Sequence, residues 1–241
     1  MLQRFTTRAL GALAALAAAA PTALADGPDL QGLDADEVRR RAEAEERARP
    51  KVAVSGAGAA ARLRALEAAV RKAPRDVDAR FALARQLHLH GVDGDEDAHD
   101  QALELLEAVA RARPGPRVDA WLGSARLLEA RYTLAFWNKA DLVKEGLRLF
   151  DRAVAAAPED VQVRFLRGMA TYHLPFFFDR KPGATSDLAW VAARARTAVE
   201  AGVLTPPMGA AALFLHGVVR HERGAYGEAQ TAWRQAVELA P

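Results

Sequence analysis

The 241-residue chain contains no cysteine, few aromatic residues and almost no net charge. Without cysteine, it has no disulfide bond, no thiolate chemistry and no cysteine for a lipid anchor. Its 33 Lys and Arg residues nearly balance its 31 Asp and Glu residues. This balance argues against nucleic acid or an anionic membrane as the main partner. No stretch alternates between apolar and polar residues in the manner of a strand, so we expect an all-α protein.

Catalytic motifs are also lacking. The sequence contains no glycine-rich phosphate loop, no His-Glu-x-x-His motif and no Gly-x-Ser-x-Gly motif. The six histidines are scattered, and paired carboxylates such as Glu45 and Glu46 lie in a charged run. The sequence therefore predicts that the protein is not an enzyme and needs no cofactor.

The first 25 residues have the composition of an export signal. Arg4 and Arg8 precede an apolar run that is too short to span a bilayer well, and Ala23 and Ala25 supply an A-x-A cleavage site before Asp26. We predict cleavage after Ala25 and a periplasmic or secreted protein with no stable membrane insertion. An uncleaved N-terminal anchor is the alternative. Cleavage would leave equal numbers of basic and acidic residues.

Two further regions follow the signal. Residues 26–58 are highly charged and their apolar residues are mostly alanine, which predicts a linker that is partly helical or disordered. Residues 59–241 are predicted to form one helical domain. It begins with a leading helix in which Leu63, Leu66 and Val70 form an apolar stripe that ends at Pro74.

Helical stretches then recur along the domain. Three of them, beginning at Val77, Val118 and Val161, align without a gap. Each carries a small residue seven positions later, where it would let a second helix cross closely. Stretches that end in a proline follow as second helices, such as EGLRLFDRAVAAAP. The pattern predicts about four antiparallel helix pairs stacked as an α-solenoid. The small residues of the four copies are Ala84, Ala125, Gly168 and Gly217.

The last copy resembles the tetratricopeptide repeat (TPR), a helix-turn-helix unit of about 34 residues. The segments AWLGSA and LPFFFDR are similar to a group of exported bacterial TPR proteins that has no assigned activity. The chain departs from the TPR pattern at Leu87 and Leu128, where tyrosine is usual, and at Ser124 and His216, where leucine is usual. The residues that carry the resemblance are Gly217, Tyr226, Ala229, Trp233, Ala236 and Pro241.

TPR proteins bind partner proteins or peptides in a concave groove that their first helices line. The resemblance therefore implies a groove in which His88, Glu129, Tyr172 and His221 form a row. Arg85 and Arg126 would lie one turn away and hold a carboxylate of the partner. Alternatively, the aromatic members pack against neighbouring helices. The full set of groove residues that the resemblance implies is Phe81, Arg85, His88, Arg126, Glu129, Met169, Tyr172, Phe214, Val218 and His221, with Leu122 and Phe165 beside them.

An acidic insertion, GVDGDEDAHD, interrupts the first helix pair. Asp93, Asp95, Asp97 and Glu104 have the spacing of a calcium-binding loop, but Ala98 replaces its turn glycine. The nearby residues His88, His90 and His99 are an alternative transition-metal set. We favour a turn without metal whose aspartates cap the next helix.

A second insertion contains Phe176, Phe177 and Phe178 after Pro175, which stops the preceding helix. Three consecutive phenylalanines cannot all point the same way. We favour a structural plug between the third and fourth pairs, and a hydrophobic contact for a partner is the alternative.

Three functions therefore compete. The first is an exported scaffold or adaptor that binds a protein or peptide. The second is a periplasmic solute-handling component, similar to the TPR component associated with some tripartite transporters, which needs an enclosed cavity lined by the first helices. The third is a metal-binding helical protein. The sequence does not identify a specific partner or an oligomeric state.

Overall fold

The computed structural model describes Arg40, residues 58–133 and residues 136–240, so the predicted signal peptide and nearly all of the predicted linker lie outside the described residues. Within the two long ranges the chain is helical and forms no strand. The helices are α3 (Ala59–Lys72), α4 (Val77–Val92), α5 (Glu96–Ala112), α6 (Pro116–Tyr132), α7 (Phe136–Ala156), α8 (Val161–Thr171), the 3-10 helix η1 (Phe176–Phe178), α9 (Lys181–Ala192), α10 (Ala195–Glu200), α11 (Pro206–Glu222) and α12 (Tyr226–Leu239).

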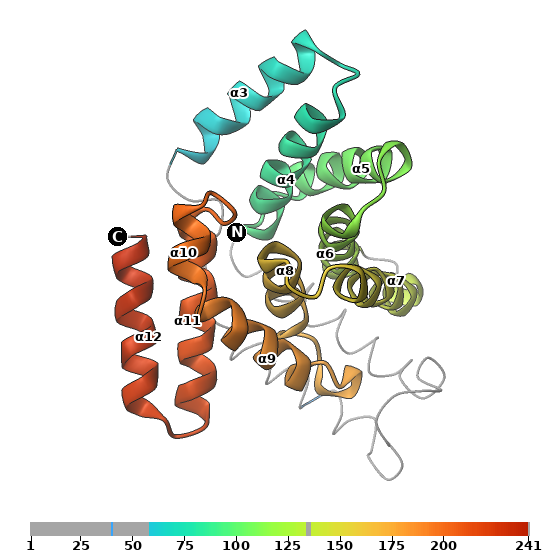
Figure 1. The fold of residues 1–241 in the computed structure, drawn as a ribbon. Helices are drawn as coiled ribbons and strands as arrows, with labels where there is room; N and C mark the ends of the chain where they lie inside the picture. Colours follow the sequence, from blue (N-terminus) through green and yellow to red (C-terminus); the bar gives the residue numbers. More distant parts are fainter. Residues whose placement is uncertain (1–39, 41–57, 134–135, 241) are drawn as a thin grey trace, which may run out of the picture.

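Consecutive helices form adjacent pairs, as Figure 1 shows most plainly for α11 and α12. The pairs are α4 with α5, α6 with α7, α8 with α9, and α11 with α12, and α3 packs against α4. This arrangement confirms the predicted all-α solenoid of helix pairs. Among the described helices, none combines the length and the apolarity needed to cross a bilayer.

Aspartates start two of the first helices in the same way. Asp76 accepts hydrogen bonds from the backbone N–H groups of Asp78 and Ala79 at 2.9 and 3.2 Å. Asp160 does the same for Gln162 and Val163, at the same two distances. Each cap satisfies N–H groups that have no partner within the helix. The aligned sequence positions therefore begin α4 and α8 at equivalent points.

One apolar core runs through the pairs. Trp121 of α6 and Phe150 of α7 are fully buried in it, together with residues of α4, α5, α8, α9 and α11. At the N-terminal end, the predicted stripe of Leu63, Leu66 and Val70 on α3 packs against Leu83 and Leu87. The pairs thus bury their apolar faces against one another, as expected for a repeat array.

The small residues lie at helix crossings in the third and fourth pairs, as predicted. A Cβ atom added to Gly168 would lie 3.2 Å from both Asp187 Cβ and Leu188 Cγ on α9. A Cβ atom on Gly217 would overlap the indole of Trp233 on α12, at 2.6 Å from its Cδ1. Gly217 is therefore required for close approach, whereas a side chain at Gly168 would make α9 shift slightly.

In the second pair the prediction is wrong by two residues. The helices approach most closely at Gly123 and Gly146, where a Cβ atom on Gly123 would lie 2.9 Å from the Gly146 carbonyl oxygen. Ala125 is buried in the core shared with neighbouring pairs. Two residues correspond to about 200° of rotation around a helix, so Gly123 and Ala125 lie on nearly opposite faces.

In the third pair, the sequence pattern predicts a first helix but no second helix. Here α9 fills that role, and the short helix α10 packs against α11. The pattern fails because α9 carries Pro182 and Gly183 near its start and buries Asp187.

We predict that Gly217→Leu lowers the free energy of unfolding by about 1–3 kcal/mol or more, because the new side chain must displace the Trp233 indole. Denaturant unfolding measures the change. Gly227→Leu is the control, since no heavy atom lies within 4 Å of a Cβ atom at this position in α12. Equal unfolding midpoints for the two variants would contradict the α11–α12 packing.

Candidate functional site

The row of groove residues that the resemblance implies does not form. His88 is only 1% exposed and lies in the interface between α4 and α6. Its Nε2 is 2.8 Å from Ser124 Oγ, and its ring meets the Trp121 ring edge-on at 5.6 Å. Burial, assisted by nearby His99, lowers the pKa of His88 to about 3. His88 is therefore a neutral core residue, and its assignment to the groove is wrong.

Tyr172 is also buried, with 6% of its surface exposed. Its hydroxyl donates to Glu222 Oε1 at 3.2 Å, and burial together with the Glu222 charge raises the pKa of Tyr172. His221 is exposed, but its ring lies 5.1 Å from the Tyr226 ring and 5.8 Å from the Trp233 ring. It therefore faces α12, the second helix of its own pair, and does not continue a row from Tyr172.

Arg126 is fully engaged between three helices. Its guanidinium lies 2.5 Å from Glu107 of α5, 2.8 Å from Glu129 of α6 and 3.2 Å from Glu145 of α7. Burial opposes its charge, but the hydrogen bond with Glu129 and the charges of Glu145 and Glu107 raise the pKa of Arg126 overall. Arg126 holds neighbouring pairs together, and carboxylates of this chain already balance its charge, which does not favour its predicted role.

Arg85 differs from Arg126 in its surroundings. Its guanidinium carbon lies 5.7 Å from the centre of the Phe81 ring and 5.3 Å from the Trp121 ring. Its Nε is buried without a hydrogen-bond partner, and no described carboxylate pairs with the side chain. Burial and the positive charge of Arg117 lower the pKa of Arg85. Arg85 is therefore a partly buried cation that lacks an anion.

The surroundings of Arg85 come from two first helices. Phe81 and Arg85 lie on α4, whereas Arg117 and Trp121 lie on α6. Arg117 itself pairs with Asp160 of α8, with 2.6 Å between Nε and Oδ2. We call Phe81, Arg85, Arg117 and Trp121 the Arg85 site. Arg117 and Trp121 were not predicted as site residues, although both lie in the first two turns of α6, close to its N-terminus.

The other groove residues that the resemblance implies are mostly packing residues. Met169 and Phe214 are half-buried against the apolar cluster of Tyr172, Leu188 and Leu215. Leu122 and Phe165 are buried, and Val218 is half-buried. The alternative that aromatic members pack against neighbouring helices therefore holds for Phe165.

The acidic insertion acts as a cap. Asp95 accepts a hydrogen bond from the N–H of Ala98 at 3.0 Å and begins α5, as predicted. Asp93 follows the last turn of α4, and Asp97 and Glu104 are exposed on α5. Within residues 58–133 and 136–240 no three His, Asp or Glu side chains converge as a metal site. Of these acidic residues, Asp95 is the one whose side chain caps α5.

The phenylalanine insertion is a plug, but at a different place from the one predicted. Phe177 is 1% exposed, Phe178 is buried and Phe176 is half-buried. They pack against Ala130 of α6 and Val143 and Leu147 of α7. Phe177 and Phe178 are thus not available to a partner. The plug seals the second pair and does not lie between the third and fourth pairs, because η1 folds back onto α7.

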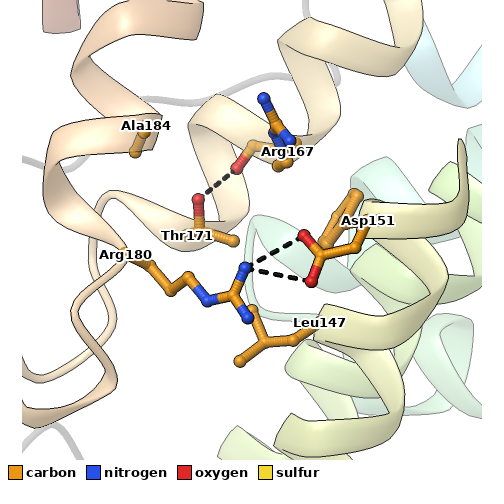
Figure 2. A pocket seen from close by; sticks show the side chains of 8 residues that line it. Leu147, Asp151, Arg167, Thr171, Arg180 and Ala184 are labelled. Carbon is orange, nitrogen blue, oxygen red and sulfur yellow. Dashed lines mark hydrogen bonds and ion pairs between the residues drawn. The ribbon is translucent and has the colours of Figure 1, made fainter. Parts of the chain in front are cut away.

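A small pocket of about 80 Å³ lies between α7, α8 and the start of α9 (Figure 2). In it, Arg180 pairs with Asp151 at 2.9 and 3.1 Å, and the Thr171 hydroxyl donates to the Arg167 carbonyl oxygen at 2.7 Å. The Arg167 guanidinium turns away from Arg180 and pairs with Asp187 at 2.6 Å. The polar groups thus satisfy one another, and the pocket suits a few water molecules better than a ligand.

No protein-family model matches the chain, and comparison with curated proteins and with solved structures gives no match either. The likeness to TPR proteins therefore remains a resemblance.

We predict that Asp187→Asn is far more destabilising than Asp151→Asn. Asp187 is 0% exposed and holds both Arg164 and Arg167, at 2.9 and 2.6 Å, so neutralising it leaves two guanidinium groups without an anion. We expect a loss of about 3 kcal/mol of unfolding free energy. Asp151 forms an exposed pair, so its variant should lose less than about 1 kcal/mol. Chemical unfolding compares the two, and similar losses would contradict this assignment.

We predict that calcium or zinc in moderate excess raises the melting temperature by no more than about 1 °C, because Asp95 serves as a cap. A larger rise that disappears in Asp93→Ala with Asp95→Ala would establish a metal site. The comparison is made within each variant, with and without metal, since loss of the cap itself destabilises α5.

Proposed function

We propose that this protein is an exported scaffold that binds a segment of another polypeptide, and that the segment presents a carboxylate to Arg85. The observation that carries the proposal is the partly buried Arg85 guanidinium with no described carboxylate beside it. Export rests on the composition of residues 1–25.

The Arg85 site suits an anion for electrostatic reasons. Removing a charged group from water without pairing it is unfavourable, so a bound anion gains more there than at an exposed arginine. Arg126 and Arg167, which are also partly buried, already have carboxylates. Arg80 on the same helix resembles Arg85 in that its Nε is buried without a hydrogen-bond partner. Arg117 adds positive potential beside Arg85. The site is therefore a local excess of positive charge in a chain that is nearly neutral.

The shape of the site favours a carboxylate. A guanidinium that lies over aromatic rings keeps its planar edge for two parallel hydrogen bonds, which match the two oxygens of a carboxylate. Phe81 is half-buried and provides apolar surface next to the charge. A polypeptide can supply both features. An acidic side chain or the C-terminus provides the carboxylate, and the neighbouring side chains would lie against the first helices.

The other two functions receive less support from the described residues. Sites for small organic ligands usually have volumes of about 300–1,000 Å³. The pocket in Figure 2 has about 80 Å³ and its polar groups are paired. A larger hollow of about 280 Å³ lies between α11 and α12, but it is open to solvent and only His216 of its lining belongs to a first helix. Neither is the enclosed cavity lined by first helices that the solute-handling alternative needs. The described residues bring no three metal ligands together, which does not favour the metal-binding alternative.

A peptide array tests the proposal with defined probes. It contains random peptides in matched sets, in which each Asp or Glu is replaced by Asn or Gln and each C-terminus is free or amidated. We expect the retained peptides to bind at least tenfold more weakly when the acid is removed. We also expect Arg85→Gln to weaken their binding at least tenfold, as for a desolvated charge pair.

Arg148→Gln is the matched control, since Arg148 is exposed on α7, a helix that contributes no residue to the Arg85 site. Its binding should equal that of the unmodified protein. Arg152 is unsuitable as a control, because it pairs with Asp119 at 2.6 Å. Peptide binding that is indifferent both to the acid and to Arg85 would refute the proposal. Binding that instead depends on half-buried Phe176 would assign the partner to the phenylalanine insertion.

A further inference from the structure

Two buried imidazoles lie in the region where α4, α5 and α6 pack together. His88 of α4 lies against Ser124 and Trp121 of α6, and His99 is in the first turns of α5. The His99 ring lies 5.4 Å from the ring of Tyr132 on α6. Each histidine is only 1% exposed.

Their ring nitrogens are poorly satisfied. Both nitrogens of His99 and Nδ1 of His88 are buried, and none of them has a hydrogen-bond partner among the described residues. An apolar side chain in either place would avoid leaving buried polar atoms without partners. A Cβ atom at Gly91 would lie 2.9 Å from His99 Cβ, so α4 approaches α5 closely at His99. The closed arrangement of α4, α5 and α6 therefore holds two neutral imidazoles with no room for their hydration.

We propose that His88 and His99 form an acid-sensitive latch, in which proton uptake by the two imidazoles in mild acid releases α4 and α5 from α6. The released state exposes both rings to water, which solvates the imidazolium ions that the closed interface cannot accommodate. This inference does not depend on the proposed function.

In the closed state, the charged groups around the latch do not balance the positive charge of a protonated His88 or His99. On α4, the cation Arg85 lies one turn before His88. On α5, Asp100 neighbours His99 and favours its charged form, whereas Arg126 of α6 opposes it. Burial outweighs these effects and lowers the pKa of His99, and burial lowers that of His88 to about 3. Ser124 and Tyr132 are neutral, and the Tyr132 hydroxyl donates to the Gly91 carbonyl oxygen at 2.5 Å. Beyond Tyr132 lie Arg131 of α6 and the acids Asp93, Asp95 and Glu96 at the α4–α5 turn. His90 of α4 is half-buried, and its Nε2 has no hydrogen-bond partner among the described residues.

The direction of the pH effect follows from these pKa values. A solvated histidine has a pKa of about 6.5, so above this pH neither the open nor the closed state binds a proton. Below it, the open state binds protons and the closed state does not, so acid favours opening. The ratio of open to closed protein should rise up to tenfold per pH unit for each histidine, and up to about a hundredfold per unit for the pair.

The carboxylate that joins α4 to the end of α5 acts in a different pH range. Asp78 of α4 pairs with Arg113 at the end of α5, which holds the pKa of Asp78 below its usual value of 3.8. Its protonation weakens the first pair only in stronger acid. A response above about pH 5 that disappears when the histidines are replaced therefore reports on the histidines and not on carboxylates such as Glu107 and Glu129.

Hydrogen exchange of the full chain, followed by mass spectrometry between pH 7 and pH 4, tests the latch. After correction for the intrinsic exchange rate, we expect protection of α4 and α5 to fall by more than tenfold per pH unit below about pH 6. The internal control is α9, which contains no histidine and should keep its protection. Protection of α4 and α5 that stays constant down to pH 4 would overturn the proposal.

Histidine variants test how many protons are taken up on opening. His99→Phe retains a ring next to Tyr132 but cannot titrate, so the fall should become no steeper than tenfold per pH unit. The double variant His88→Gln with His99→Phe should abolish the pH-dependent fall in protection of α4 and α5. His221→Phe, at an exposed position on α11, should leave the profile of α4 and α5 unchanged. An unchanged slope in the double variant would overturn the latch, and if that variant does not fold, the slope of the unmodified protein decides the question.

Discussion

The array depends on the close approach of paired helices at positions without a side chain. In the second pair, the backbones themselves meet, and a Cβ atom on Gly146 would lie 2.8 Å from the Gly123 carbonyl oxygen. In the fourth pair, the space beside Gly217 holds the Trp233 indole, whose Nε1 donates to the Phe214 carbonyl oxygen at 3.1 Å. A missing side chain thus permits either backbone contact or insertion of a large ring. Both bring the helices close enough to bury continuous apolar faces.

Ion pairs then join elements that the apolar faces alone would not orient. Arg126 connects α5, α6 and α7 through carboxylates, and Arg152 of α7 holds buried Asp119 of α6 at 2.6 and 2.7 Å. Asp187 of α9 binds two arginines of α8. Since removing one partner of a buried pair is strongly unfavourable, these contacts fix the register between helices. Against this background, Arg85 is notable because it is partly buried without such a partner.

Local patterns were sufficient to predict the helical class, the leading helix and the crossings at Gly168 and Gly217. They could not predict which way each helix is rotated, because rotation depends on the neighbouring helix. Ala125 and Gly123 are both small, and only the packed structure shows that Gly123 faces α7. The misplaced groove residue His88 has the same cause. The sequence does not predict that Asp187 is buried in α9, because the two arginines that balance its charge lie on another helix.

The Arg85 site and the histidine latch share one helix, and this joins the two proposals thermodynamically. Arg85 lies one turn from His88 on α4 and stacks on Trp121, the same α6 residue that contacts His88. Release of α4 from α6 would separate the two sides of the Arg85 site, so a partner would bind the closed state only. By mass action, such a partner stabilises the closed state, and opening then requires a lower pH. Acid would in turn weaken the partner's affinity by the same coupling free energy, although neither imidazole touches the partner.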